Sequence, residues 1–136
     1  MADSRPTGGC EGKLVLVADD DAAVVGVIHE ALAKEGFTVV SAGNGAQCLA
    51  LVASRRPDVV VMDLSMPSMS GMEALRSLRH DPQTRLLPVV IITGRTDFGS
   101  LVEGWMSGAE SYLRKPLQME VLVREVKRLA GGDGKA

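Results

Sequence analysis

The stretch Leu14-Val15-Leu16-Val17-Ala18-Asp19-Asp20 is an apolar run that ends abruptly in two acids, and it is the first of several such runs in the chain. Three later apolar segments also end at a residue that can interact with a phosphoryl group. They are Val59-Val60-Val61-Met62 before Asp63, Val89-Val90-Ile91-Ile92 before Thr93, and Tyr112-Leu113-Arg114 before Lys115-Pro116. Short apolar runs without alternation are typical of parallel strands buried on both faces. Because ligands of open α/β sheets bind at the carboxyl ends of the strands, we expect these polar groups to converge at one edge.

Helical patterns separate the apolar runs. We expect helices over residues 22–34, 46–54, 70–79, 97–107 and 118–130, and strands over 14–18, 37–41 and 111–114, with two more that follow Pro57-Asp58 and begin at Pro88. Gly36 is expected to end the first helix in a left-handed conformation. Strands that alternate with helices through short connections form a parallel sheet with right-handed crossovers. The sequence therefore predicts an α/β fold, a doubly wound sandwich with helices on both faces.

Length and composition fit one compact domain, which we place at residues 13–130 between a flexible leader (1–12) and a flexible tail (131–136). Aromatic residues make up only 3% of the chain, so an aliphatic core is expected. A net charge of −2 gives no general electrostatic reason to bind nucleic acid or anionic lipid. No apolar stretch reaches membrane-spanning length and the first residues lack a signal-peptide core. Cys10 and Cys48 have no metal-binding spacing, and we expect a reduced, cytoplasmic protein.

The residue types at the predicted edge indicate phosphoryl chemistry with a metal ion. Asp19 and Asp20 repel each other unless a hard cation such as Mg²⁺ binds them through carboxylate oxygens. Asp63 could complete that site and also act as a nucleophile, since carboxylates form acyl phosphates. Lys115 would add positive charge and Thr93 a hydrogen bond. A third acid, Asp21, is expected to cap the first helix.

Four motifs, in this order and at these spacings, resemble the response regulator receiver domains of two-component signalling. They span about residues 13 to 130 and read Leu16-Val17-Ala18-Asp19-Asp20-Asp21, Met62-Asp63-Leu64-Ser65-Met66-Pro67 with Gly71 following, Ile92-Thr93-Gly94, and Tyr112-Leu113-Arg114-Lys115-Pro116. The resemblance implies a flavodoxin-like sheet with strand order 2-1-3-4-5. It also implies a cis peptide bond between Lys115 and Pro116.

The resemblance further implies a phosphoacceptor regulator rather than an ordinary enzyme. Asp63 would receive its phosphoryl group from phosphohistidine on a sensor histidine kinase or a histidine phosphotransfer protein. Mg²⁺ would be held by Asp20, Asp63 and the backbone carbonyl of Ser65, with Asp19 acting mainly through water. Thr93 and Lys115 would contact the phosphoryl oxygens, and Tyr112 would be the aromatic residue that changes rotamer.

The expected output surface comprises the helix over 97–107, the strand over 111–114 and the helix over 118–130. Leu101 and Trp105 are four residues apart and so share one helix face, which we place at the centre of this surface. Alternatively, Trp105 packs into the core. The partner would be a downstream protein or a second copy that associates after phosphorylation. We expect Cys48 to be a core residue and His29 and His80 to be surface residues.

Two other functions share parts of this pattern. A phosphatase of the haloacid dehalogenase kind needs a second acid two residues after its nucleophile, where Ser65 stands. A flavodoxin-like FMN carrier needs hydroxyl and amide donors after the first strand, where Asp19-Asp20-Asp21 would repel phosphate. Because no effector domain follows the last helix, we expect a stand-alone receiver or one excised from a longer protein.

Overall fold

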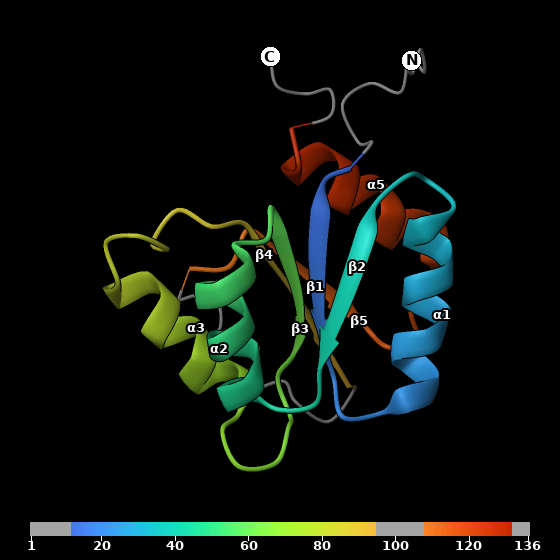
Figure 1. Ribbon diagram of the computed structural model, residues 1–136. Coiled ribbons are helices and arrows are strands. Elements are labelled where there is room, and N and C mark those ends of the chain that lie inside the picture. The colour runs from blue at the N-terminus through green and yellow to red at the C-terminus, as the bar shows by residue number, and fades with distance from the viewer. Residues whose placement is uncertain (1–11, 95–107, 132–136) are drawn as a thin grey trace.

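The computed structural model describes residues 12–94 and 108–131, which form a central sheet with helices on both faces (Figure 1). Its elements, in chain order, are β1 (Leu14–Ala18), α1 (Ala22–Ala33), β2 (Thr38–Ala42), α2 (Gly45–Arg55), β3 (Val59–Asp63), α3 (Gly71–His80), β4 (Val89–Thr93), β5 (Ser111–Arg114) and α5 (Met119–Leu129). The expected helix over 97–107, with Leu101 and Trp105, lies outside the described residues.

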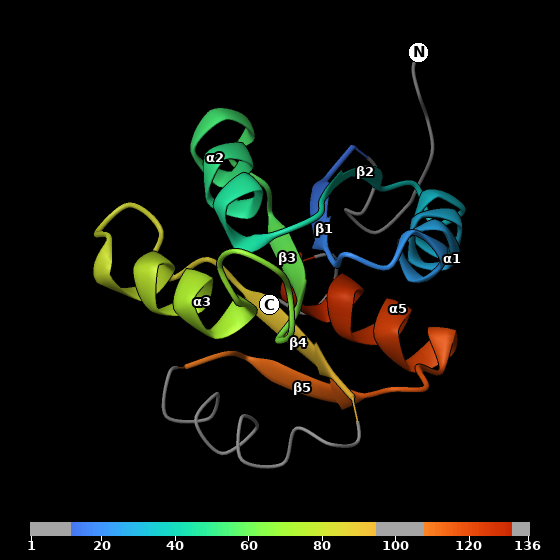
Figure 2. The ribbon, with the colours of Figure 1, turned by 90° about the horizontal axis from the view of Figure 1, so that it is seen from below.

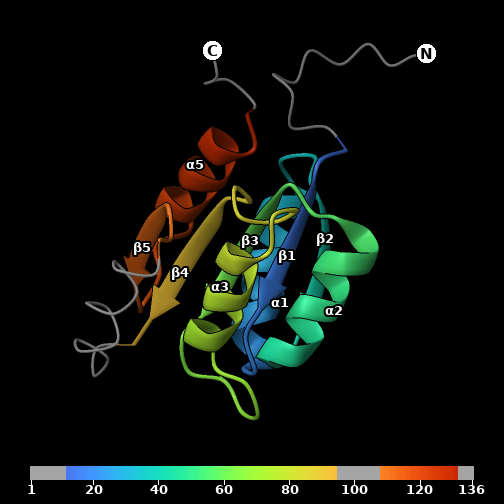
Figure 3. The same ribbon diagram turned by 90° about the vertical axis from the view of Figure 1, so that its left-hand side faces the viewer.

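All five strands are parallel, in the order β2-β1-β3-β4-β5. Figure 2 shows the sheet between two pairs of helices, with α1 and α5 on one face and α2 and α3 on the other. Figure 3 shows the α2–α3 face toward the viewer, with α1 behind the sheet. The predicted doubly wound fold and its strand order are therefore confirmed. No helix in the described residues has the length and apolar character that crossing a membrane would need.

The core consists of two aliphatic layers, one on each face of the sheet. Leu16 and Ala18 of β1 pack in the layer beneath α2 and α3, whereas Val15 and Val17 pack in the layer beneath α1 and α5. Every residue of β3 and β4 is buried. Burying one Val or Ile side chain contributes about 1.5–3 kcal/mol, which explains why these strands are apolar up to their last residues, Asp63 and Thr93.

Local signals set the helix boundaries. The Asp21 carboxylate accepts hydrogen bonds from the backbone N–H groups of Ala23 and Val24, so the predicted cap of α1 is confirmed. Gly36 has a φ of 99°, as expected for the turn after α1. Ser70 and Glu73 form a reciprocal capping box at the start of α3, a feature that was not predicted. The predicted and observed boundaries of the described elements otherwise agree within one or two residues.

Three further predictions, two on burial and one on a peptide bond, are also confirmed. Cys48 is fully buried in the layer beneath α2 and α3. His29 and His80 are exposed. The peptide bond between Lys115 and Pro116 is cis.

Candidate functional site

Three carboxylates meet at the carboxyl edge of the sheet. Asp63 is the last residue of β3, and Asp19 and Asp20 follow the neighbouring strand β1. One oxygen from each of the three side chains lies within 4.8 Å of the others. Asp19 and Asp63 are buried, whereas Asp20 is exposed. The predicted convergence of the acids is therefore observed, and the site has one acid open to solvent.

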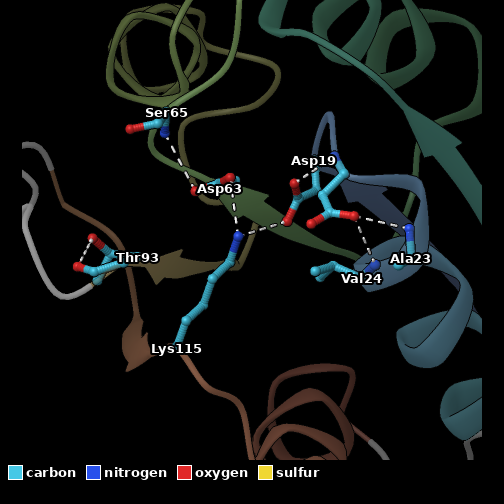
Figure 4. A network of polar contacts seen from close by, with 9 residues as sticks. Asp19, Ala23, Val24, Asp63, Ser65, Thr93 and Lys115 are labelled. Carbon is cyan, nitrogen blue, oxygen red and sulfur yellow. Dashed lines mark hydrogen bonds and ion pairs between the residues drawn. The ribbon is translucent and has the colours of Figure 1, made fainter.

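Lys115, which follows the edge strand β5, brings a positive charge to the two buried acids. Its Nζ lies 3.2 Å from Oδ2 of Asp19 and 3.3 Å from Oδ2 of Asp63 (Figure 4). The backbone N–H of Lys115 donates to the carbonyl of Thr93 at 2.8 Å, which fixes the residue just beyond β5. One ammonium thus bridges the ends of β1 and β3.

Backbone N–H groups hold the remaining oxygens of the buried acids. Oδ1 of Asp19 accepts from the N–H of Asp21 at 2.9 Å. Oδ1 of Asp63 accepts from the N–H of Ser65 at 3.3 Å. These contacts fix both carboxylates in place, with their second oxygens aimed at Lys115.

Charge is not balanced in this cluster. Burial and, next, the charge of Asp19 raise the pKa of Asp63 to about 6, because together they outweigh the lowering effects of Lys115 and the Ser65 N–H. Burial by itself disfavours the ammonium of Lys115, but its hydrogen bonds and the charges of Asp19 and Asp63 outweigh this and raise the pKa of Lys115. The raised pKa values of Asp63 and Lys115 both indicate that the site favours additional positive charge.

Thr93 and Tyr112 occupy different levels of the sheet. Thr93 is buried at the end of β4, where Oγ1 donates to the carbonyl of Gly94 at 3.3 Å. Figure 4 shows it on the side of Asp63 opposite Asp19. Tyr112 is half-buried further back on β5, opposite Ile91, and its hydroxyl accepts from the N–H of Ala109 at 3.3 Å.

The connection from β3 to α3 closes tightly around Asp63. The N–H of Gly71 donates to the carbonyl of Leu64 at 3.0 Å, and a Cβ at Gly71 would lie 2.1 Å from the carbonyl oxygen of Asp63. In the sequence Gly71 appears only as part of a motif, and this contact was not predicted. An open cleft beside the acids is lined by Asp20, Leu64, Ser65, Met66, Pro67, Ser70 and Met72. The acids are thus accessible from the Asp20 side.

The chain is similar to known signalling proteins over most of its length. The family model for the response regulator receiver domain matches residues 15–127. The DNA-binding response regulator MtrA of Mycobacterium tuberculosis is 39% identical over 113 residues, which is 83% of this chain and 48% of that protein. The chain thus spans about half the length of the curated relatives it matches.

Solved structures agree with this similarity. The chemotaxis response regulator CheY4 of Vibrio cholerae superposes with a TM-score of 0.80 at 30% identity, covering 87% of this chain and 98% of that one. The receiver domain of the sensor histidine kinase PA1611 of Pseudomonas aeruginosa, solved with a magnesium ion in its active-site cleft, has a TM-score of 0.81 at 27% identity. That match covers 88% of this chain and 98% of the other. This chain therefore belongs to the response regulator receiver domain family.

Proposed function

We propose that this protein is a phosphorylation-controlled signalling switch that accepts a phosphoryl group on Asp63. The donor would be phosphohistidine on a sensor histidine kinase or a histidine phosphotransfer protein, which implies a cytoplasmic location. The observation that carries the proposal is the buried Asp63 carboxylate, which is held beside two further acids and 3.3 Å from Lys115. Phosphoryl transfer requires mainly positioning and charge neutralisation, and this arrangement offers both.

In the transfer step, a carboxylate oxygen of Asp63 attacks phosphorus, the P–O bond forms, and the P–N bond to the donor histidine breaks. Asp63 must be ionised for this attack, and a pKa of about 6 leaves it mostly ionised at neutral pH. The ammonium of Lys115 would neutralise a phosphoryl oxygen, and the hydroxyl of Thr93 would donate a hydrogen bond to another. The product is an acyl phosphate on Asp63.

The donor set fits a hard divalent cation. Carboxylate oxygens are the ligands that Mg²⁺ prefers, and three of them lie within 4.8 Å of one another with one residue open to water. Asp20, Asp63 and the backbone carbonyl of Ser65 would hold the ion, and Asp19 would act mainly through water. When bound, Mg²⁺ would supply positive charge for the phosphoryl oxygens.

The output of the switch would be a protein contact rather than catalysis on a small molecule. Phosphorylation would draw Thr93 toward Asp63, and Tyr112 would move into the vacated space. Both arrangements would pre-exist, with phosphorylation shifting their populations. The responding surface would include β5, α5 and the segment that carries Leu101 and Trp105, and it would bind a downstream protein or a second copy. We propose no direct contact with nucleic acid and none with membranes.

Phosphorylation of Asp63 can be tested by incubating the protein with acetyl phosphate and Mg²⁺ and measuring intact mass. We expect one added phosphoryl group in the wild type and none in Asp63→Asn. The control is Asp81→Asn, an exposed acid beyond α3, which should be labelled like the wild type. Labelling of Asp63→Asn to the wild-type extent would refute the assignment.

The output surface can be tested separately with Trp105→Ala. We expect phosphorylation at Asp63 to persist while phosphorylation-dependent dimerisation or partner binding is lost. Binding that is unchanged in this variant would place the output surface elsewhere, and α1 would be the next surface to test.

A further inference from the structure

Arg79, near the end of α3, connects this helix to two other segments of the chain, one at Leu87 and one over residues 108–110. Its Nε donates to the carbonyl of Gly108 at 2.9 Å and its Nη1 to the carbonyl of Leu87 at 3.0 Å. Its Nη2 lies 3.0 Å from Oε1 of Glu110. The side chain is only 16% exposed, so these contacts are partly shielded from water. A planar guanidinium can bind acceptors in several directions at once, which the single ammonium of a lysine cannot reproduce.

The contacts of Arg79 converge on the turn that enters β5. Oε1 of Glu110 also accepts from the N–H of Val89 at 2.8 Å, so one carboxylate oxygen connects Arg79 to the first residue of β4. The backbone N–H of Glu110 donates to the carbonyl of Val89 at 3.0 Å. Gly108 has a φ of 90°, a conformation that favours glycine. The turn over residues 108–110 is therefore held by α3 and β4 together.

The same turn contacts the hydroxyl of Tyr112. Ala109, between the two residues that Arg79 binds, donates its N–H to Oη of Tyr112 at 3.3 Å. This hydrogen bond draws the hydroxyl back toward the start of β5. Thr93, in contrast, pairs with Arg114 at the other end of that strand. In this arrangement the hydroxyl of Tyr112 is thus directed away from the phosphoryl site.

We propose that Arg79 is a positioning residue that retains Tyr112 in its resting arrangement by fixing the turn over 108–110. The inference rests on the proposed function, because it assumes that Tyr112 moves when Asp63 is phosphorylated. Arg79 makes two contacts with the turn itself, a charge-assisted hydrogen bond to the carbonyl of Gly108 and an ion pair with Glu110, and both limit the freedom of the turn. Removing them frees the N–H of Ala109 to move and raises the population in which Tyr112 has left it.

The chain contains a single tyrosine, so 3-fluorotyrosine reports on Tyr112 alone in ¹⁹F NMR spectra. We would record the signal in the full-length protein with Mg²⁺, with and without beryllofluoride as a phosphoryl mimic. In Arg79→Gln without beryllofluoride, we expect a shift along the line that leads from the resting to the beryllofluoride-bound wild type. The apparent affinity for beryllofluoride should rise by roughly five- to tenfold, a typical coupling between two sites.

The control is Arg76→Gln, an exposed arginine on the same helix, which should match the wild type in both measurements. Glu110→Gln is a milder variant that keeps an oxygen for the N–H of Val89 but removes the ion pair with Arg79. It should move both readouts in the same direction by a smaller amount, and it tests the proposal if Arg79→Gln does not fold. Signals and affinities of both variants equal to those of Arg76→Gln, even with reduced stability, would overturn the inference. If the ¹⁹F signal of the wild type does not change when beryllofluoride is added, the proposed function would be overturned, and the inference with it.

Discussion

At Asp63, burial and charge act against each other within a single side chain. The carboxylate is nearly inaccessible to solvent and lies in a cluster with Asp19 and Asp20, yet it has the ammonium of Lys115 at 3.3 Å. Burial has the largest effect on its pKa and Asp19 the next, and together they exceed the opposing effect of Lys115. Relative to the unfolded chain, the fold therefore disfavours the ionised form that a nucleophile needs.

We expect this conflict to appear as a pH-dependent loss of stability in the metal-free protein. Between the ordinary pKa of 3.8 and the folded-state value of about 6, the native protein holds a proton that the unfolded chain has released. Raising the pH through this window therefore favours unfolding. After allowing for screening and for coupling to Lys115, we expect Asp63 to account for a loss of about 1–2 kcal/mol.

Urea denaturation in EDTA, at several pH values across this window, measures the effect. Asp63→Asn should lose this part of the pH dependence and be the more stable protein at pH 7. The control is Glu30→Gln, an exposed acid on α1, which should keep the wild-type dependence. If Asp63→Asn keeps the wild-type pH dependence, folding does not raise the pKa of the Asp63 carboxylate.

Cys48 illustrates how burial suppresses reactivity at a single residue. It is fully buried, and burial raises the pKa of its thiol from 9.0 to about 12. The thiolate is the reactive form, so at pH 8 its population should be roughly a thousandfold lower than in the unfolded chain. In a Cys10→Ser background, we expect negligible colour from a disulfide reagent until guanidinium is added. Rapid reaction of the native protein would contradict the buried placement.

Among the connections between elements, the one from β3 to α3 tolerates the least change. A Cβ at Gly71 would overlap the carbonyl oxygen of Asp63, whereas a Cβ at Gly26, within α1, would meet no atom within 4 Å. Gly71→Ala should therefore destabilise the protein by about 1–3 kcal/mol, as overpacking does, and reduce labelling of Asp63. Gly26→Ala should stabilise it by about 0.5–1 kcal/mol, because alanine favours helix. Thermal denaturation distinguishes the two signs, and a neutral Gly71→Ala would mean that the loop can relax.

The elements that the sequence predicted best are those with an abrupt chemical boundary. The predicted bounds of β1 and β5 match the observed ones, since acids follow the first strand and Lys115-Pro116 follows the last. Phe37 was assigned to a strand, but β2 begins one residue later, because a buried aromatic residue just before a strand has the same pattern as one within it. Apolar pattern alone does not separate these cases.

The residues that form the candidate site could be predicted from the sequence, but the contacts between their side chains could not. Sheet topology alone brings Asp19, Asp63 and Thr93 to one edge of the sheet, independently of the conformations of their side chains. The network of Arg79 was not predicted, because its side-chain partner Glu110 is 31 residues away and no periodic pattern connects them. Contacts of that kind depend on how α3 packs against the entry to β5.

On the scale of the whole molecule, Lys115 connects an edge of the sheet to its centre. β5 is one of the two edge strands, and β4 and β3 separate it from β1. The side chain of Lys115 nevertheless reaches the acids at the ends of both β3 and β1. The cation therefore connects β5 to the ends of β1 and β3 in addition to its place in the site.

Replacing this cation should have opposite effects on stability and on metal binding. Lys115→Met leaves two buried carboxylates without their ammonium, and we expect a loss of about 1–3 kcal/mol in EDTA, less than for a fully buried pair. The same substitution removes a positive charge that repels Mg²⁺, so affinity for the ion should rise by roughly tenfold.

Lys34→Met, which removes an exposed charge from the C-cap of α1, should change neither quantity appreciably. Denaturation in EDTA and calorimetric titration with Mg²⁺ provide the two measurements. Weaker Mg²⁺ binding in Lys115→Met would mean that Lys115 organises the acids for the metal, and that its positioning of Asp19 and Asp63 outweighs its repulsion of the ion.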